Sequence, residues 1–258
     1  MIYVTVPGDT VSSISHQSGV PVWKIIYDNQ LGEEGKLTVG QALLLLKPQE
    51  SAEIREDLYV TGYAYPFIEP YVLEMAFPAL NELLVFSYGF TFEGELVPPI
   101  QDETWMIQLA WENGIEPMLV LTPFTQGVFN NQLIQTLVEE ESVRKNVITN
   151  LLKVVEEKGY VGVDVDFEYV RAQNREGYAE FVGELRAAMN EKGYRVSVAL
   201  APKTSSDQKG LLYEGIDYAL LGEQADRLFL MTYEWGYSYG PPMAVAPLEK
   251  VRQVVEYA

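Results

Sequence analysis

The sequence of 258 residues contains no cysteine and a single histidine, His16. Without cysteine there can be no disulfide, thiolate nucleophile or cysteine metal site. One histidine cannot build a multi-histidine metal site, and a Ser-His-Asp triad is close to excluded. Any chemistry must therefore run on carboxylates, tyrosines or a bound group, and we expect neither a metal nor a cofactor.

Positive charge is also scarce, with 18 Lys and Arg against 37 Asp and Glu, a formal net charge of −19. Nucleic acid and anionic lipid are poor partners for such a chain, because both need clustered Lys and Arg. Long hydrophobic runs are missing, so we expect no membrane span. Met1 leads directly into an alternating pattern, and we see no secretory signal peptide. A neutral or weakly charged polymer is compatible with this composition.

The first 48 residues read as one small unit in the order strand, helix, helix, strand. An alternating stretch at 2–6 precedes a turn that ends in helix-capping residue types. One short helix follows from Val11 and stops at Gly19, and another follows Pro21 and ends near Asn29. A second strand is expected at 42–46. Residues 49–56 are polar and charged, which is typical of a linker.

Residues 57–258 alternate apolar strands with helical patterns, which predicts an α/β fold with a parallel sheet and helices outside it. The predicted strands are 58–65, 83–90, 116–122, 162–169, 195–201 and 228–233. The predicted helices are 103–113 after Asp102, 143–158 between a Ser142 cap and Gly159, and 177–192 before Gly193. Six strands suit a doubly wound sheet or part of a TIM-type barrel. No dinucleotide-binding glycine motif follows the first strand.

The most informative stretch is Gly-Val-Asp-Val-Asp-Phe-Glu-Tyr at 162–169. Side chains alternate along a strand, so Asp164, Asp166 and Glu168 share one face and the apolar residues share the other. In a barrel the acids would point inward, near the end of the strand where sites occur. Neighbours on one face lie roughly 6.5–7 Å apart, so the acids cannot all ionise comfortably.

We expect one or two of these acids to hold a proton at neutral pH, with mutual repulsion keeping one on Glu168. A protonated carboxylic acid is what cleavage of a glycosidic bond requires, since the leaving oxygen must be protonated. Two other interpretations remain. The acids could face solvent on an edge strand, or they could hold Mg²⁺ or Ca²⁺, although no second acidic cluster is clearly placed to complete such a site.

These residues resemble the motif of glycoside hydrolase family 18, Asp-x-x-Asp-x-Asp-x-Glu on the fourth barrel strand, with Val161 in place of the first acid. The family's Met-x-Tyr-Asp/Glu motif is matched on the sixth strand by Met231, Tyr233 and Glu234. Segments 62–66, 86–90 and 201–203 resemble the spore cortical-fragment-lysin branch. Leu-Thr-Pro at 121–123 replaces the Ser-x-Gly-Gly of ordinary chitinases, which favours a peptidoglycan substrate.

The resemblance implies a retaining mechanism assisted by the substrate, in which the 2-acetamido oxygen attacks C1. Glu168 would protonate the leaving oxygen and later deprotonate water. Asp166 would bind the acetamido N–H, and Tyr233 would donate to its carbonyl. Asp164 would tune Asp166. Tyr63, Met231 and Glu234 would line the sugar pocket.

Residues 1–48 resemble a LysM module, which binds glycans that contain N-acetylglucosamine. Gly8, Asp9 and Thr10 carry the match, together with Gly19, Asn29 and the Val-Gly-Gln at 39–41. The first three would contact glycan. Gly8 and Thr10 could equally serve as a turn and a helix cap.

A closed barrel needs eight strands and six are visible, so the barrel is expected to be truncated after strand six, with an open edge suited to self-association. The resemblance implies hydrolysis of N-acetylglucosamine bonds in spore-cortex peptidoglycan. The alternative is a non-catalytic spore protein that binds peptidoglycan or chitin, and a chitinase-like enzyme is third. The expected location is the spore coat, cortex or cell wall without a signal peptide, and otherwise the cytoplasm.

Overall fold

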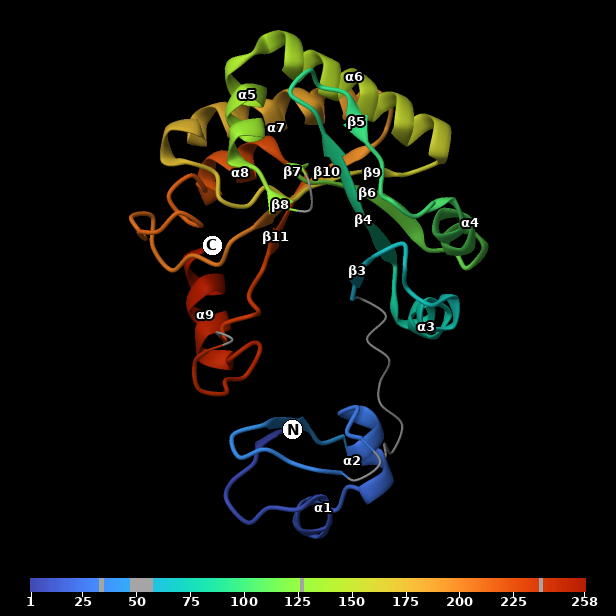
Figure 1. Ribbon diagram of the computed structural model, residues 1–258, viewed down its shortest axis with the longest axis vertical. Coiled ribbons are helices and arrows are strands. Elements are labelled where there is room, and N and C mark those ends of the chain that lie inside the picture. Colours follow the sequence, from blue (N-terminus) through green and yellow to red (C-terminus); the bar gives the residue numbers. More distant parts are fainter. Residues whose placement is uncertain (33–34, 47–57, 126–127, 237–238) are drawn as a thin grey trace. The chain divides into compact units, whose positions relative to one another are not determined.

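The computed structural model describes residues 1–32, 35–46, 58–125, 128–236 and 239–258 (Figure 1). The chain divides into two compact units. One contains Met1–Asp57 with Thr232–Gln253, and the other contains Leu58–Met231 with Val254–Ala258. Each unit is described by itself below. The linker expected at 49–56 lies outside the described residues.

The N-terminal residues form the predicted order of strand, helix, helix, strand, as β1 (Ile2–Val4), α1 (Val11–Ser18), α2 (Val22–Asp28) and β2 (Ala42–Leu44). The two strands pair antiparallel, with Ile2 opposite Leu44. Ile14 from α1, Ile25 from α2 and Leu43 from β2 fill the core and are almost completely buried. Helix α1 ends where Gly19 adopts a left-handed φ of +73°, which a residue without Cβ reaches at little cost.

The second unit is built on six parallel strands in the spatial order β11-β10-β9-β6-β4-β3. They are β3 (Thr61–Ala64), β4 (Glu82–Phe90), β6 (Glu116–Leu121), β9 (Gly162–Val165), β10 (Arg195–Leu200) and β11 (Arg227–Leu230). A short strand, β5 (Leu96–Val97), adds to β4 in the antiparallel sense. The predicted α/β class with a parallel sheet is confirmed.

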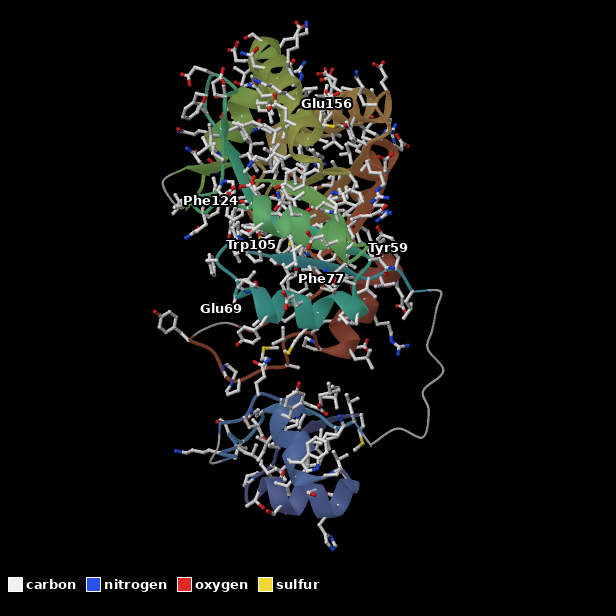
Figure 2. All side chains as sticks on the ribbon, turned by 90° about the vertical axis from the view of Figure 1, so that its right-hand side faces the viewer. Tyr59, Glu69, Phe77, Trp105, Phe124 and Glu156 are labelled. Carbon is white, nitrogen blue, oxygen red and sulfur yellow. The ribbon has the colours of Figure 1, made fainter. Side chains whose placement is uncertain are left out.

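Helices cover the outer face of this sheet (Figure 1). They are α3 (Pro70–Ala76), the 3₁₀ turn Phe77–Ala79, α4 (Thr104–Glu112), α5 (Asn131–Glu139), α6 (Glu141–Lys158), the 3₁₀ turn Ala172–Asn174, α7 (Arg175–Asn190) and α8 (Tyr218–Gln224). The side chains of Phe77 and Trp105 pack in the layer between these helices and the sheet (Figure 2). A hairpin of β7 (Phe124–Thr125) and β8 (Val128–Phe129) follows β6, and α9 (Leu248–Tyr257) comes last. Among the described residues, no helix is both long and apolar enough to cross a bilayer.

The inner face of the curved sheet carries a second, smaller apolar cluster of Leu84, Met118 and Val120. Val161, which stands where the acidic motif departs from its pattern, packs against this cluster. Between β9 and β10 the backbones approach so closely at Gly162 that a Cβ there would lie 2.1 Å from the Arg195 carbonyl oxygen. The start of the acidic strand therefore accepts only glycine without rearrangement.

Three sequence predictions were wrong in detail. The sixth strand was expected to run to Tyr233, but β11 ends at Leu230, so Met231, Tyr233 and Glu234 follow the strand and do not lie on it. The acidic strand was expected to run to Tyr169, but β9 ends at Val165. The chain leaves the sheet after Asp166, and Tyr169 takes a left-handed φ of +59°. Helix α6 begins at Glu141, so Ser142 lies inside its first turn and does not cap it. Glu140 is extended and separates α5 from α6, serving as the C-cap of one and the N-cap of the other.

Candidate active site at the end of strand β9

Asp164 lies in the middle of the sheet, on a strand paired on both sides. The register places Val120 of β6 and Ser197 of β10 directly beside it, and Arg227 of β11 beside Ser197. A solvent-facing edge strand, one alternative from the sequence, is therefore wrong. The predicted alternation is correct, because Val163, Val165 and Phe167 all pack in the outer core.

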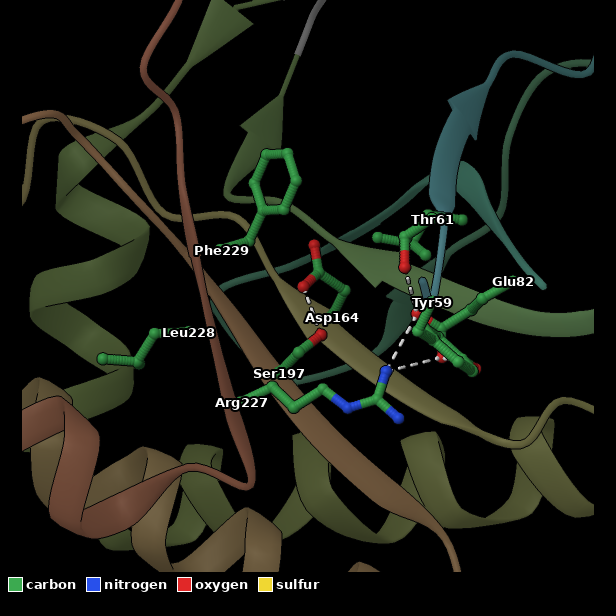
Figure 3. Close-up of a pocket in the computed structure, with 9 residues that line it drawn as sticks. Tyr59, Thr61, Glu82, Asp164, Ser197, Arg227, Leu228 and Phe229 are labelled. Atoms are coloured by element: carbon green, nitrogen blue, oxygen red, sulfur yellow. Dashed lines mark hydrogen bonds and ion pairs between the residues drawn. The ribbon is translucent and has the colours of Figure 1, made fainter. Parts of the chain in front are cut away.

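Both oxygens of the Asp164 carboxylate are hydrogen-bonded, and its side chain is 0% exposed. The Tyr63 hydroxyl donates to Oδ2 at 2.7 Å, and the Ser197 hydroxyl donates to Oδ1. Figure 3 shows Asp164 and Ser197 side by side on the wall of a half-open cavity of about 450 Å³. Burial raises the pKa of Asp164 to about 6, and the two hydroxyl donors limit the rise because they favour the charged form.

Asp166 follows the last residue of β9 and is 7% exposed. Its N–H still donates to the Leu121 carbonyl at 2.9 Å, which continues the ladder with β6 for one residue. Its Oδ1 is buried and has no hydrogen-bond partner among the described residues. Burial, and then the charges of Asp164 and Glu168, raise the pKa of Asp166 to about 8. Asp166 therefore holds a proton at neutral pH.

Glu168 is partly buried and sits between two well-fixed aromatic residues. The Phe167 ring stacks on Phe90, Tyr178 and Phe181, with centroid distances of 5.8, 5.4 and 5.9 Å. Tyr169 has the positive φ given above, a conformation that costs a tyrosine of order 1–3 kcal/mol. Such strain at a residue beside an acidic pair is typical of functional sites.

The three acids do not form a recognisable metal site. Across the part of the chain that the structure describes, no three His, Cys, Asp or Glu side chains are grouped so that they could hold a metal ion. The sequence had left Mg²⁺ or Ca²⁺ open as an interpretation of these acids. Burial first, and then the charges of Asp164 and Glu168, act on Asp166 and favour its protonated form.

Tyr63 and Met231 also come to the inner face of this unit. Besides its bond to Asp164, the Tyr63 ring lies 5.4 Å from Phe229 and 6.4 Å from Phe86. Met231 directly follows β11, and its N–H donates to the Leu200 carbonyl at 3.0 Å. Tyr233 and Glu234 fall in Thr232–Gln253, which belongs to the other unit, so the structure does not place them relative to Asp166. Glu234 has a left-handed φ of +59°, the same value as Tyr169.

In the N-terminal unit, the three predicted glycan contacts lie in one turn, where Asp9 and Thr10 have hydrogen-bond partners of their own. Gly8 adopts a φ of +93° in the turn after β1. Asp9 Oδ2 accepts from the Tyr3 hydroxyl at 2.9 Å and from the Val6 N–H at 2.8 Å. Thr10 caps α1, and its hydroxyl oxygen accepts from the Ser13 N–H at 3.0 Å. Their side-chain bonds therefore fix the shape of this turn.

Sequence reasoning missed Ser197, Ser87 and Thr122. Ser197 is the polar residue among Val196, Val198 and Leu200, so an inward-facing polar position was visible, but not its partner. The hydroxyl groups of Ser87 and Thr122 lie 3.0 Å apart, where β4 and β6 approach their ends. These contacts follow from strand register, which the local sequence does not reveal.

Two protein-family models match this chain. The model of glycosyl hydrolases family 18 matches residues 127–257, and the LysM domain model matches residues 3–45. The cortical fragment-lytic enzyme of Bacillus subtilis is 39% identical over 184 residues, which is 71% of this chain and 42% of that protein.

Solved structures agree. The Bacillus cereus spore cortex-lytic enzyme SleL superposes with a TM-score of 0.73 at 31% identity, over 99% of this chain and 59% of that one. A chitinase from Chromobacterium violaceum shares the fold, with a TM-score of 0.71 at 22% identity over 78% of this chain and 64% of that one. The chain thus spans less than two thirds of these relatives. It folds as a partial TIM-type barrel of six parallel strands, and with its acidic strand and an N-terminal LysM domain it belongs to glycoside hydrolase family 18.

Proposed function

We propose that this chain hydrolyses N-acetylglucosamine bonds in bacterial peptidoglycan, with spore cortex as its substrate. The observation that carries the proposal is the acid set at the end of β9: one carboxyl fully buried and bonded, the next buried with a raised pKa, and the third partly open. The similarity to a cortical fragment-lytic enzyme and to a spore cortex-lytic enzyme supports the choice of polymer.

In the proposed reaction Glu168 is the general acid and base. It gives its proton to the glycosidic oxygen while the substrate's own 2-acetamido oxygen attacks C1 and forms a cyclic intermediate. Water then attacks C1, Glu168 takes the proton of that water, and the configuration is retained. This use of the substrate as nucleophile replaces the second carboxylate of most glycosidases.

Asp166 and Asp164 support that cycle. Asp166 would accept the acetamido N–H. When its proton is shared onto Asp164, its negative charge would stabilise the positive charge that develops on the acetamido group, in a dry place where such an interaction is strong. Asp164 is fully buried, so it would act through Asp166 and not by touching sugar. Tyr233 would donate to the acetamido carbonyl, and Tyr63, Met231 and Glu234 would line the sugar pocket. These roles rest on the family resemblance.

We further propose the division into a LysM glycan-binding module at 1–48, a linker at 49–56 and a partial catalytic barrel at 57–258. The LysM module, with Gly8, Asp9 and Thr10 as proposed contacts, would hold the chain on its insoluble polymer. Association with spore cortex or cell wall follows from that binding. Self-association through an open sheet edge stays a prediction.

The test is digestion of purified spore cortex, with the fragments identified by mass spectrometry. The wild type should create new reducing ends at N-acetylglucosamine. Glu168→Gln should lose nearly all cleavage but still sediment with cortex. Glu156→Gln makes the same chemical change at an exposed position of α6 and should behave as wild type (Figure 2). Full cleavage by Glu168→Gln would overturn the assignment, and a wild type that binds without cleaving would favour the non-catalytic glycan-binding alternative.

A further inference from the structure

A second cavity, of about 510 Å³, opens where β3 and β4 end, and the proposed mechanism does not use it. It is lined by the segments around Tyr65, Ser87 and Pro98 and by Phe124, which is labelled in Figure 2. We call it the side groove. Its volume falls within the range of about 300–1,000 Å³ that small-molecule sites occupy.

One half of the side groove is aromatic. The rings of Tyr65 and Phe67 stack with a centroid distance of 4.9 Å and an interplanar angle of 19°, and Phe86 meets Tyr65 edge-on at 4.9 Å. Tyr65 is 50% and Phe67 65% exposed. Such open ring faces suit the apolar face of a pyranose ring.

The other half is aliphatic. Val97 and two consecutive prolines, Pro98 and Pro99, form a stiff wall, and Ile100 stands 98% exposed at its end. Among the described residues that line the groove, none is charged, although the chain as a whole carries a net charge of −19. A charged group bound here would find no counter-charge, so the ligand must present a neutral, apolar part at this wall.

Two short chains of contacts connect the side groove with the acid site. Ser87 lines the groove and contacts Thr122, whose neighbour Leu121 accepts the Asp166 N–H. Phe124 also lines the groove and meets Phe129 at 4.9 Å, and Phe129 meets Tyr169, next to Glu168, at 6.4 Å. The groove and the acids therefore both lie where these parallel strands end, which is the arrangement that the proposal below requires.

We propose that the side groove recognises the lactyl-alanyl substituent that distinguishes peptidoglycan from chitin. The sugar that bears it stacks on Tyr65 and Phe67, and its methyl groups lie against the Val97–Ile100 wall. The lactyl carboxyl is neutral when it is joined to alanine as an amide, and the alanine's own carboxylate is directed away from the uncharged lining into solvent. This inference rests on the proposed function and adds its specificity, since a plain N-acetylglucosamine polymer has nothing to fill the aliphatic half.

The experiment measures binding by calorimetry in the Glu168→Gln background, so the readout does not depend on turnover. The probes are a chito-oligosaccharide and a peptidoglycan oligosaccharide of equal length that carries lactyl-alanine. Ile100→Ser removes apolar contact from a side chain too exposed to affect folding. It should weaken the lactyl-alanyl ligand about fivefold, as expected for one or two lost methyl contacts, and the chito-oligosaccharide less than twofold. Met75 lies on the outside of α3 and is 65% exposed, so Met75→Ser should leave the affinity for both ligands unchanged.

Phe67→Ala should weaken both ligands, because both can stack on its ring. Equal effects of Ile100→Ser on the two ligands, or no effect on either, would overturn the groove assignment. The proposed function is judged separately. If the wild type cleaves cortex but Ile100→Ser affects the two ligands equally, only the groove assignment is refuted. If the wild type neither binds nor cleaves cortex, the groove assignment and the proposed function are both refuted.

Discussion

Arg227 Nη1 on β11 lies 3.4 Å from Glu82 Oε1 on β4, although 145 residues separate the two in the chain (Figure 3). The Arg227 guanidinium also sits 4.5 Å above the Tyr59 ring, just ahead of β3. β3 and β11 are the two ends of the strand order. The sheet is therefore curved so strongly that side chains from its two ends meet across the inner face, and Glu82 is the group they share.

Glu82→Gln should lower the free energy of unfolding by about 1–3 kcal/mol, less than a fully buried pair would lose, because its arginine partners are partly solvated. Glu82 is 3% exposed and also accepts from Thr61 and Arg195. Arg227→Gln should cost less, since Arg227 is 41% exposed in its side chain. Urea unfolding measures both. Glu157→Gln, from an exposed pair with Lys153 at 4.0 Å, is the control, and an equal loss there would contradict the prediction.

Tyr63→Phe keeps the ring contacts and removes the donor to Asp164 Oδ2. A hydroxyl bond to a charged carboxylate contributes about 1.5–3 kcal/mol, and a bond to the protonated form less. The pKa of Asp164 is about 6, so the loss of stability should be larger at pH 8 than at pH 5. Thermal unfolding at the two values measures it. Tyr71 is exposed on α3, so Tyr71→Phe should leave the stability unchanged at both pH values. A loss of stability in Tyr63→Phe that is the same at pH 5 and pH 8 would argue against the prediction.

Asp166→Asn should flatten the dependence of stability on pH. The folded-state pKa is about 8 against an ordinary value of 3.8, so between about pH 4 and 8 the native state holds a proton that the unfolded state has lost. The stability associated with Asp166 is thus fully present below pH 4 and is lost as the pH rises through 8. The wild type should lose several kcal/mol more than the variant over this window. Chemical denaturation at pH 5, 6.5 and 8 compares them, and parallel curves would refute the assignment.

Asn29 joins the second helix to the second strand in the LysM domain. Its amide donates to the Ile25 carbonyl at 2.9 Å and the Leu44 carbonyl at 2.8 Å, and it accepts from the Leu44 N–H at 2.6 Å. Asn29→Ala should destabilise this domain by about 2–3 kcal/mol, because backbone groups of β2 lose their partner. Hydrogen exchange over residues 1–46 reads this out. Gln17→Ala, exposed on α1, is the control, and unchanged protection in Asn29→Ala would rule the role out.

The sequence was a good guide wherever periodicity decides the outcome. Alternation correctly placed Asp164 opposite Val163 and Val165, and Gly159 marked the end of α6 through its left-handed φ of +81°. It failed where tertiary geometry decides. Nothing in a tyrosine announces a left-handed backbone, so the end of β9 was set too late.

Partners across strands were equally hidden. Ser197 meets Asp164 because β9 and β10 pair in one register out of several that their apolar patterns allow. The expected proton on Glu168 was a statement about mutual repulsion alone. That expectation stays a prediction. Burial, which the sequence does not quantify, raises the pKa of the neighbouring Asp166 to about 8.

The tight contact at Gly162 limits which residue the start of the acidic strand can hold. A methyl group there would push β9 away from the Arg195 backbone and weaken the pairing of β9 with β10. That pairing sets Asp164 beside Ser197, so a displaced strand would carry the acid away from its hydroxyl partner. Replacing one hydrogen atom by a methyl group, at a residue with no side chain of its own, is therefore expected to disturb the acids from a distance.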